Sequence, residues 1–311
     1  MKNIVVIGSL NVDVLQRIVR LPKEGETLSI LNKSSNFGGK GANQALAAAR
    51  QGAIVSFIGA VGADSEGQRF IQLLEHEGIN SQFIQTKDGS TGTAYIMLEE
   101  DGHNTILVHG GANADLTVDD VEQARLLIEN ADIVLAQLEV PRTVIAHGFA
   151  IAKAAGAMTI LNPAPVTRRI EADILSHTDL LIPNETEAAA LLNLPASTDY
   201  QTLKERLPLY HEQLGIQNLI ITLGEAGAFF AIGRHIGPVK NFHVAVEDTT
   251  AAGDTFIGTI ATTIEPNFTN IERTLQKAAA AAAIAVSKPG AIPSIPYQEE
   301  IARKLAPMTM S

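Results

Sequence analysis

Apolar and polar positions alternate in blocks along most of the chain. Short apolar runs with the character of buried strands are followed by stretches whose apolar residues recur at helical spacing. The predicted strands are Asn3–Gly8, Ile54–Ile58, Ile133–Leu138, Met158–Leu161, Leu180–Ile182, Leu219–Leu223 and Ala228–Ile232. The predicted helices are Gly41–Gln51, Ser65–His76, Val118–Asn130, Thr143–Ala155, Glu185–Asn193, Thr202–Leu214, Gly253–Thr263 and Ile271–Val286. This alternation predicts an α/β fold with a mainly parallel central sheet and helices on both faces, and it places ligands at the carboxyl ends of the strands.

Two regions break the alternation, because strand-like segments follow one another there without a helix between them. The strands predicted in these regions are Val12–Val19, Leu28–Lys33, Gly92–Glu99 and Asn104–His109. Glu100-Asp101-Gly102 fits a hairpin turn between the last two. We expect a small accessory β sheet from about residues 12–34 and 92–109, within one domain that spans residues 1–311, because no repeat or linker divides the chain.

Composition narrows the class of protein. A chain of 311 residues with 46% hydrophobic content can build one large α/β domain with a sizeable core. The absence of cysteine excludes disulfides, thiolate zinc sites and a cysteine nucleophile, and it fits a cytoplasmic protein. A net charge of −11 argues against binding to nucleic acid or to an anionic membrane surface. The N-terminal apolar run lacks the features of a signal peptide, and Ala278–Val286 is too short to span a bilayer.

The segment Asp248–Asp254 carries the most informative polar pattern. Small residues and a glycine precede Asp254, and a helix-compatible stretch follows it. A helix N-terminus of this kind presents free backbone N–H groups to an anion. A carboxylate beside that anion hole is placed to accept a proton from a hydroxyl that attacks a phosphate. The segment therefore predicts phosphoryl transfer to an alcohol.

Upstream polar residues suit a ligand with several hydroxyls, although each also has a purely structural interpretation. The glycines of Gly38–Gly41 let the backbone approach a ligand beside Asn43, or they form a simple turn into a helix. Asn11 and Asp13 lie on one face at the carboxyl end of the first strand, where they bind vicinal hydroxyls or are solvated loop residues. Glu139 follows another strand and is a further candidate for a substrate contact.

The second half of the chain offers two candidate segments for the nucleotide. Asn184 and Glu187 have the N-cap and N3 spacing of a capping box, which is the interpretation that the spacing favours. The alternative places both residues at the hydration shell of Mg²⁺ or at a phosphate. The segment Thr222–Gly227 closes a strand with two glycines, which turn against a nucleotide or form an ordinary β-turn.

Several common motifs are excluded. Gly38–Gly41 is not a P-loop, because Ser34 occupies the position of its first glycine and a glycine follows Lys40. Gly59–Gly62 lacks the full dinucleotide-binding pattern, which argues against a dehydrogenase. Neither His-Glu pair continues into a zinc-protease motif, and the sequence has no G-x-S-x-G elbow.

Taken together, these segments resemble the ribokinase group of the PfkB-type carbohydrate kinases. The resemblance runs from Gly8–Asp13 to Gly290–Ser294, and Gly38–Asn43 and Asp248–Asp254 match the two family signatures in the right order. The segments most similar to the ribokinase group are Gly39-Lys40-Gly41-Ala42-Asn43-Gln44 and Asn162-Pro163-Ala164-Pro165. The resemblance implies ATP-dependent phosphorylation of D-ribose at its 5-hydroxyl. The alternatives are a sister kinase for 2-deoxyribose, another sugar or a nucleoside, and a non-catalytic sugar-binding protein.

The resemblance also implies roles for individual residues. The implied sugar-binding residues are Asn11, Val12, Asp13, Gly39, Lys40, Gly41, Ala42, Asn43, Glu139 and Asp254. The implied base and anion hole are Asp254 with Ala251, Ala252 and Gly253. The residues implied to lie along ATP are Asn184, Glu187, Thr222, Leu223, Gly224, Glu225, Ala226, Gly227, Gly253, Asp254 and Ala279. At Ala279 many relatives carry a polar residue near the adenine, so this alanine implies looser recognition of the base or apolar and backbone contacts.

Two further expectations rest on the resemblance. Mg²⁺ would bridge the phosphates, and a monovalent cation, usually K⁺, would order the anion-hole loop. The implied cation site consists of Asp248, Thr250, Ala285, Lys288, Gly290 and Ser294. The accessory strands would form a lid over the sugar, and such lids pair into a homodimer in ribokinases.

Overall fold

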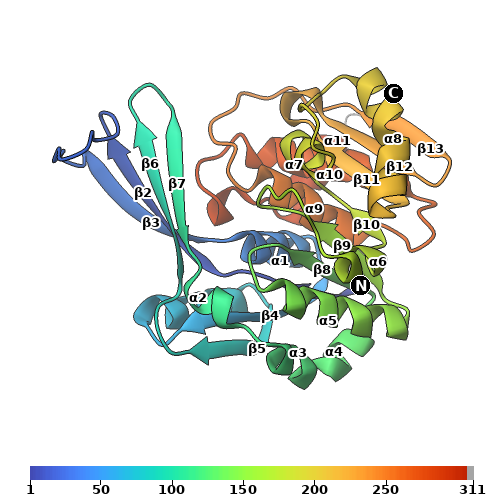
Figure 1. The fold of residues 1–311 in the computed structure, drawn as a ribbon, viewed down its shortest axis with the longest axis horizontal. Coiled ribbons are helices and arrows are strands. Elements are labelled where there is room, and N and C mark those ends of the chain that lie inside the picture. The colour runs from blue at the N-terminus through green and yellow to red at the C-terminus, as the bar shows by residue number, and fades with distance from the viewer. Residues whose placement is uncertain (307–311) are drawn as a thin grey trace.

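The structure is a computed structural model that describes residues 1–306. Its main sheet has nine strands in the order β13-β12-β11-β10-β9-β8-β1-β4-β5 (Figure 1). These strands are β1 (Asn3–Ile7), β4 (Ile54–Gly62), β5 (Asn80–Lys87), β8 (Ile133–Gln137), β9 (Met158–Asn162), β10 (Leu180–Leu181), β11 (Asn218–Thr222), β12 (Ala228–Ile232) and β13 (His235–Val239). Neighbouring strands are parallel from β5 to β11, and β12 and β13 extend the sheet with antiparallel pairing. The predicted α/β fold with a mainly parallel sheet is confirmed.

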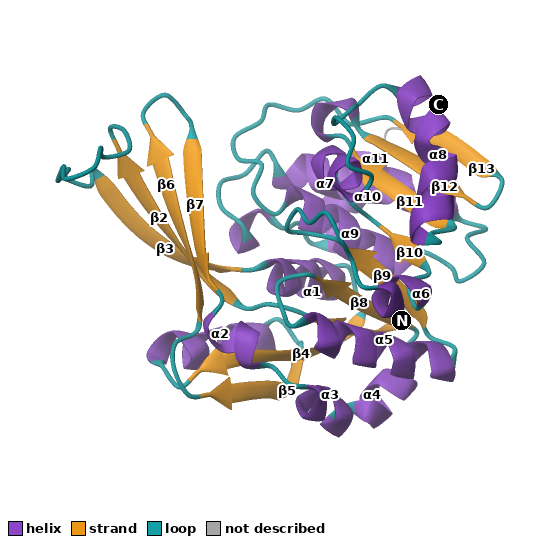
Figure 2. Ribbon diagram, viewed as in Figure 1, coloured by secondary structure: helices purple, strands orange, loops and turns teal. Residues whose placement is uncertain are grey.

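Helices cover both faces of this sheet (Figure 2). They are α1 (Lys40–Arg50), α2 (Ser65–His76), α3 (Val118–Gln123), α4 (Arg125–Glu129), α5 (Arg142–Ala155), α6 (Ala172–Ser176), α7 (Glu185–Leu191), α8 (Tyr200–Leu214), α9 (Ala252–Thr263), α10 (Ile271–Ala285) and α11 (Gln298–Leu305). Successive residues of β1 enter different cores, since Ile4 packs with α1, α2, α9 and α10 and Val5 packs with α3 to α8. This period of two in a continuously apolar strand is what a sheet buried on both faces requires.

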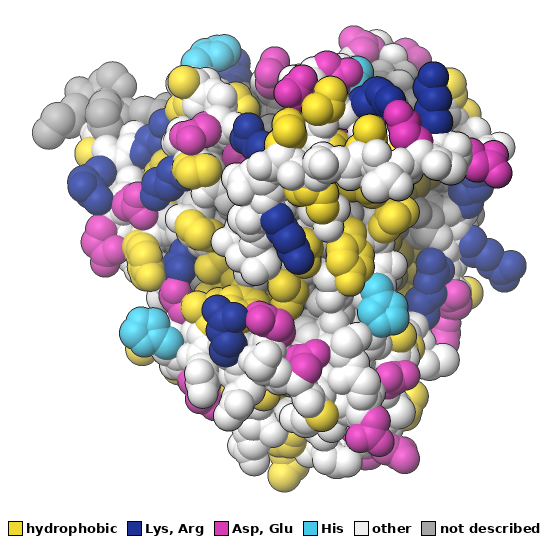
Figure 3. All heavy atoms as spheres, turned by 90° about the vertical axis from the view of Figure 1, so that its left-hand side faces the viewer, with side chains coloured by type: hydrophobic (Ala, Val, Ile, Leu, Met, Phe, Trp, Pro, Cys, Tyr) yellow, Lys and Arg dark blue, Asp and Glu magenta, His cyan; other side chains and the backbone are white. Residues whose placement is uncertain are grey.

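A second sheet of four strands projects from the main body, in the order β3-β2-β6-β7 (Figure 1). Its strands are β2 (Asn11–Ile18), β3 (Asn32–Gly38), β6 (Gly92–Glu99) and β7 (Asn104–His109). Asn11 pairs with Gly38 on one side and with Gly92 on the other, so the three strands meet at the base of the sheet. Figure 3 shows the side of the molecule on which this sheet lies, with hydrophobic side chains spread over the surface.

Several predicted boundaries were wrong, and some elements were missed. The strand predicted at Leu28–Lys33 lies instead at Asn32–Gly38, where pairing with β2 imposes an extended backbone on a mostly polar segment. The helix predicted at Val118–Asn130 is interrupted at Ala124, which separates α3 from α4. The strands β5 and β13 and the helices α6 and α11 were not predicted. The two strands lie at the edges of the main sheet, and β13 contains a proline, which weakens its strand signal.

Three 3₁₀ turns complete the description: η1 (Gly111–Asp115), η2 (Gly224–Ala226) and η3 (Ile292–Ser294). Among residues 1–306, no helix combines the length and the apolar character needed to cross a membrane.

Candidate active site

The carboxyl ends of several parallel strands deliver polar residues to one edge of the main sheet. Asn11 follows β1, Glu139 follows β8, and Asn184 follows β10. Thr222, the last residue of β11, forms an isolated bridge to Asn184. A parallel sheet collects its ligand-binding residues at this edge, because all of its strands end there.

The glycine-rich turn before α1 brings that helix close to the end of β1. Gly39 is the N-cap residue and has a φ of 90°, a conformation that side-chain-bearing residues rarely adopt. A Cβ at this position would lie 2.8 Å from the backbone nitrogen of Asn11. The turn therefore sets Lys40, Gly41, Ala42 and Asn43, which are predicted to bind the sugar, beside the end of β1.

Asn11 is buried and fixed by a residue that the sequence analysis missed. Asn113, in η1, donates through Nδ2 to Asn11 Oδ1 at 2.8 Å. The Asn113 side chain also bonds both the N–H and the carbonyl of Leu10, so its orientation is determined. This contact joins positions about a hundred residues apart, and no local sequence pattern indicates it.

Charged groups gather around this polar cluster. Glu139 accepts hydrogen bonds from the hydroxyl of Ser9 and from the backbone N–H of Lys40, the latter at 3.1 Å. Burial raises the pKa of Asp13 to about 7, and the negative charges of Glu139 and Asp254 add to this effect. Burial disfavours the charge on Lys40, but Asp254 and the neighbouring carboxylates outweigh that cost and raise the pKa of the ammonium group. The ammonium group of Lys40 is therefore the cation that balances these carboxylates.

Asp254 lies in the first turn of α9, beside an unusual N-cap. Ala251 has a φ of 59° in the left-handed region, which disfavours residues with a side chain. The backbone N–H groups of Gly253 and Asp254 belong to the first turn, where a helix offers them no carbonyl acceptor. A Cβ built on Gly253 meets no atom within 4 Å, so open space faces this turn. The Ala252 N–H donates to the Thr249 carbonyl at 3.3 Å, so Gly253 is the predicted anion-hole residue whose N–H remains for an anion beside Asp254.

Two amides hold the carboxylate of Asp254. Asn43 Nδ2 donates to Oδ2 at 3.0 Å, and Gln44 Nε2 donates to Oδ1 at 2.9 Å. Asn43 is 5% exposed, and its Oδ1 is a buried acceptor without a hydrogen-bond partner. A buried acceptor normally has a donor, so this oxygen is suited to a ligand hydroxyl. Asn43 therefore connects the residues predicted to bind the sugar to Asp254.

A cavity of about 220 Å³ opens next to Asp254. It is lined by Lys40, Asn162, Ala164, Ile182, Asn184, Glu187, Thr222, Thr249, Ala251, Gly253, Asp254 and Ile257. Seven of these residues belong to the predicted site, and the other five were not assigned a role. The five residues without a predicted role lie at the ends of β9 and β10, just before α9 or within α9. They therefore come from the same sheet edge and the same helix as the predicted residues. The cavity joins the predicted base to the residues predicted to lie along ATP.

The capping box at α7 is present, and it also faces the cavity. Asn184 Oδ1 accepts from the Glu187 N–H at 2.8 Å, and Glu187 Oε2 accepts from the Asn184 N–H at 2.9 Å. Burial raises the pKa of Glu187. Both interpretations of the spacing remain compatible, because the capping box uses Oε2 of Glu187 and leaves Oε1 of that carboxylate for Mg²⁺-bound water.

The remaining residues predicted to contact the nucleotide do not line this cavity. Gly224, Glu225 and Ala226 form η2 directly after β11, and the Leu223 N–H donates to the Gly227 carbonyl at 2.8 Å. This tight turn continues the sheet edge beyond Thr222. Ala279 is buried within α10 among the apolar residues that pack against α9.

The loop predicted to bind a monovalent cation is closed by backbone and side-chain bonds. Asp248 Oδ1 accepts from the Thr250 N–H at 2.9 Å, and Oδ2 accepts from the Gly290 N–H at 2.9 Å. The N–H groups of residues 247 and 248 both donate to the Val286 carbonyl. The structure thus brings the Asp248 loop against the segment that follows α10.

The other side chains of this predicted site have partners of their own. Lys288 Nζ pairs with Glu300 Oε1 at 2.5 Å, and the Ser294 hydroxyl donates to the Ala291 carbonyl at 2.7 Å. The Ala285 carbonyl accepts from the Lys288 N–H at 3.1 Å. Within residues 1–306, no group of three or more His, Cys, Asp or Glu side chains is arranged to hold a metal ion. Any cation at this loop would therefore rely on carbonyl oxygens.

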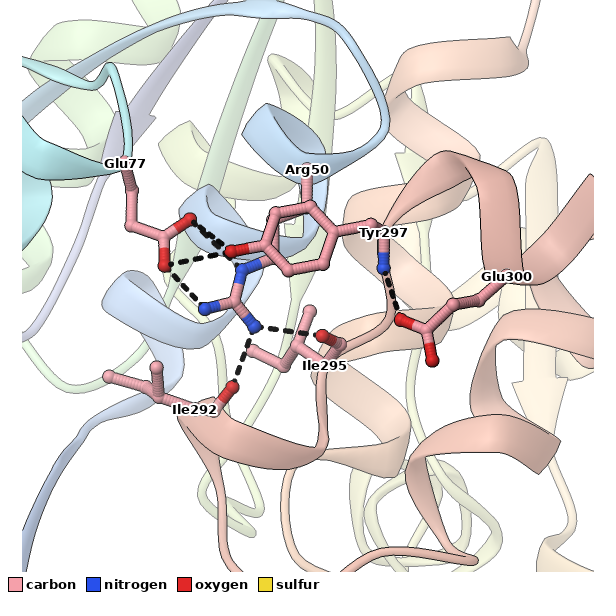
Figure 4. Close-up of polar contacts among 6 residues, drawn as sticks. All are labelled: Arg50, Glu77, Ile292, Ile295, Tyr297 and Glu300. Atoms are coloured by element: carbon pink, nitrogen blue, oxygen red, sulfur yellow. Dashed lines mark hydrogen bonds and ion pairs between the residues drawn. The ribbon is translucent and has the colours of Figure 1, made fainter.

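Arg50 fastens the same C-terminal segment to α1 (Figure 4). Its guanidinium donates to the Ile292 and Ile295 carbonyls, both at 2.8 Å, and forms a two-bonded ion pair with Glu77. The Arg50 and Glu77 side chains are only 8% and 9% exposed. The ring of Tyr297 covers the guanidinium, 4.7 Å from its centre. The sequence analysis missed this clamp, because an arginine at a helix end is usually a surface residue.

Fold and site together define a class of protein. A carboxylate at a helix N-terminus, an adjoining polar cavity and a buried cluster of amides and carboxylates are the features of a sugar kinase. The sequence pattern of the pfkB family carbohydrate kinases matches residues 1–298, and the chain belongs to that family.

Individual relatives agree with this assignment. The chain is 39% identical over 300 residues to the ribokinase of Staphylococcus aureus, covering 96% of this chain and 98% of that protein. It is 41% identical over 303 residues to the bifunctional ribokinase/ribose-5-phosphate isomerase A of Fructilactobacillus sanfranciscensis, covering 97% of this chain but only 56% of that protein. It is 34% identical over 299 residues to the deoxyribokinase of Salmonella typhi, covering 96% of this chain and 97% of that protein. The structure of Arabidopsis thaliana ribokinase complexed with ribose and ATP superposes with a TM-score of 0.88 at 33% identity, covering 98% of each chain.

Proposed function

We propose that this sugar kinase phosphorylates D-ribose at its 5-hydroxyl, converting ATP and ribose to ADP and ribose 5-phosphate. The observation that carries the proposal is the position of Asp254. Its carboxylate lines the cavity beside the open first turn of α9 and is bonded to Asn43 of the sugar-binding cluster. A single group thus adjoins both the acceptor alcohol and the phosphoryl group that moves.

In the proposed mechanism the sugar lies against Asn11, Asp13 and Asn43, with its 5-hydroxyl directed at Asp254. Asp254 accepts the hydroxyl proton while the oxygen forms a bond to the γ-phosphorus. The bond between that phosphorus and the bridging oxygen of ADP breaks, and the N–H groups of Gly253 and Asp254 stabilise the charge on the transferring group. Lys40 balances the negative charges around the site. Such a site accelerates the reaction mainly by positioning and electrostatics.

Two ions belong to the proposal. Asn184 and Glu187 would hold the water shell of Mg²⁺, which neutralises phosphate charge when it is bound. The loop that Asp248 closes would hold K⁺ through carbonyl oxygens and thereby fix the backbone that leads into Ala251. Both assignments are supported by the oxygen-rich character of these residues and by their proximity to the first turn of α9.

The choice of ribose is supported by the chemistry of the polar cluster. Asn11, Asp13 and Asn43 supply donors and acceptors for several hydroxyls, and within residues 1–306 the cavity contains only one basic side chain, Lys40. An uncharged sugar fits this set better than a sugar phosphate. A deoxyribokinase is also among the relatives, so 2-deoxyribose is the second candidate.

ATP turnover with a panel of acceptors tests the proposal. Ribose, 2-deoxyribose, fructose and adenosine would be compared in a coupled assay for ADP, with the phosphorylated position identified by NMR. We expect ribose to give the highest kcat/KM and the product to carry phosphate on O5. A preference for 2-deoxyribose would transfer the assignment to the sister kinase, and ATP consumption that no acceptor increases would contradict a kinase.

We further propose that the second sheet closes over the sugar and pairs with its copy in a homodimer. Its edge strand β7 exposes three successive apolar residues, Ile106, Leu107 and Val108, each at least 51% exposed. An edge strand with exposed apolar side chains favours pairing with another chain. Sedimentation equilibrium should give the mass of a dimer, and a Val108→Lys variant should shift it to the monomer. The absence of cysteine supports a cytoplasmic location.

A further inference from the structure

Behind Asp254 lies a buried chain of side-chain amides that the mechanism above does not use. Its members are Gln44 in α1, Gln137 at the end of β8 and Asn162 at the end of β9. Gln44 and Gln137 are fully buried, and Asn162 is 5% exposed. Buried amides lose their contacts with water, so their number and their bonding here call for a reason.

The bonds of this chain fix the orientation of Gln44. Gln137 Nε2 donates to Gln44 Oε1 at 2.6 Å. Gln44 Nε2 then donates one hydrogen to Asp254 Oδ1 at 2.9 Å and the other to Asn162 Oδ1 at 3.1 Å. Asn162 is oriented in turn, because its Nδ2 donates to the Ile182 carbonyl at 2.8 Å. A rotated Gln44 amide would turn its oxygen toward the carboxylate, so only one orientation satisfies all the partners.

The buried amides fit beside the main sheet, but one of their oxygen atoms has no hydrogen-bond partner. A Cβ at Gly8 would lie 2.4 Å from Gln137 Oε1, so only glycine at position 8 admits the Gln137 side chain in this position. Gln137 Oε1 is itself buried without a hydrogen-bond partner. An unsatisfied buried acceptor lowers stability, which argues that the chain serves a purpose other than packing.

We propose that Gln44 is a positioning residue for Asp254 and that Gln137 acts on Asp254 only through Gln44. Gln44 holds Oδ1, leaving the Oδ2 side, which Asn43 shares with the sugar cluster, to receive the proton of the attacking hydroxyl. Its N–H also stabilises the ionised form, the form that a base needs. This inference rests on the proposed role of Asp254 as the base.

The test uses Gln44→Met, which keeps the length of the side chain and removes its amide. We expect kcat to fall by about tenfold to a hundredfold, the range for a hydrogen bond to a charged group, with KM for ATP unchanged. KM for ribose should change by less than about threefold, because Asn43 still holds Asp254 Oδ2 and the sugar cluster is unchanged.

Gln51→Met is the matched control. Gln51 is a buried amide at the other end of the same helix and bonds the Pro296 carbonyl rather than Asp254. This variant should lose stability, while its kcat at saturating ribose and ATP should stay at the parent value. A Gln44→Met variant that folds and keeps the parent kcat would overturn the inference, and so would an equal loss of kcat in the control.

A double-mutant cycle tests whether Gln137 acts on Asp254 only through Gln44. Gln137→Met should lower kcat less than Gln44→Met, and the double variant should be no slower than Gln44→Met alone. If the two reductions in kcat multiply in the double variant, Gln137 acts independently of Gln44, and this part of the proposal is wrong. Asp254→Asn separates this failure from failure of the proposed function, because near-normal turnover in that variant would remove the base whatever Gln44 does.

Discussion

Replacing Asp13 by asparagine should make the free protein more stable while it weakens the sugar site. Burial, with the charges of Glu139 and Asp254, raises the pKa of this carboxyl from 3.8 to about 7. The folded protein therefore holds the Asp13 proton more tightly than the unfolded chain does. Such a group contributes stability that is fully present below its unfolded pKa and is lost as the pH rises through about 7.

The size of the effect follows from the two pKa values. Above pH 7 the ionised Asp13 side chain should destabilise the folded protein by up to about 4 kcal/mol relative to a neutral side chain. Near pH 5.5 Asp13 is protonated in the folded protein, so its destabilising effect is smaller than that at pH 8.5 by about 2 kcal/mol. Asparagine carries no charge at either pH. The stability advantage of Asp13→Asn should therefore grow by about 2 kcal/mol between about pH 5.5 and pH 8.5.

Urea unfolding without sugar, followed by circular dichroism at several pH values, measures this difference. Asp88→Asn is the control for losing one carboxylate, because Asp88 is exposed in the turn between β5 and β6. The same Asp13→Asn protein should show a KM for ribose raised by about tenfold or more, since a charged acceptor is lost. A stability difference that stays constant with pH, or a variant less stable than the parent at about pH 8.5, would refute the reasoning.

Three further predictions address the base, the cation loop and the clamp. Asp254→Asn should lower kcat by about 10²–10⁴-fold with ribose binding largely intact, and turnover near the parent rate would reject Asp254 as the base. K⁺ should activate the enzyme more than Na⁺ at equal ionic strength, and Asp248→Asn should reduce that difference; equal rates in the two salts would remove the cation site. Arg50→Met should reduce the free energy of unfolding by about 3–5 kcal/mol, because it strands the buried carboxylate of Glu77. Adding Glu77→Gln should recover part of this loss in urea unfolding, and a single-variant loss below about 1 kcal/mol would show that the pair contributes little.

The sequence predicted the elements whose signals are local. Apolar runs and capping residues indicated the buried strands and most of the helices, and the glycine before Asp254 indicated the helix start that faces the cavity. The strand β3 was misplaced because its polar residues carry no strand signal, and only pairing with β2 makes Asn32–Gly38 extended. Tertiary contacts of this kind override local propensity.

The candidate site was predicted in part for the same reason. Asn43 and Asp254 belong to recognisable segments, and the structure brings them within hydrogen-bonding distance. Asn113, Gln137 and Arg50 act through partners far along the chain, and an isolated amide or arginine in a sequence does not reveal its partner. Long-range polar contacts such as these are determined by the packing of elements, which a pattern along one chain does not specify.

The pairing of Asn11 with both Gly38 and Gly92 means that a residue predicted to bind the sugar belongs to the backbone at the base of the projecting sheet. A rigid tilt of that sheet about its root cannot leave the Asn11 end of β2 behind. If the sugar binds at Asn11 as proposed, we expect its binding to change the angle of the projecting sheet. Energy transfer between one fluorophore at the tip of the β6–β7 hairpin and another on the main body should then change as sugar is added without nucleotide.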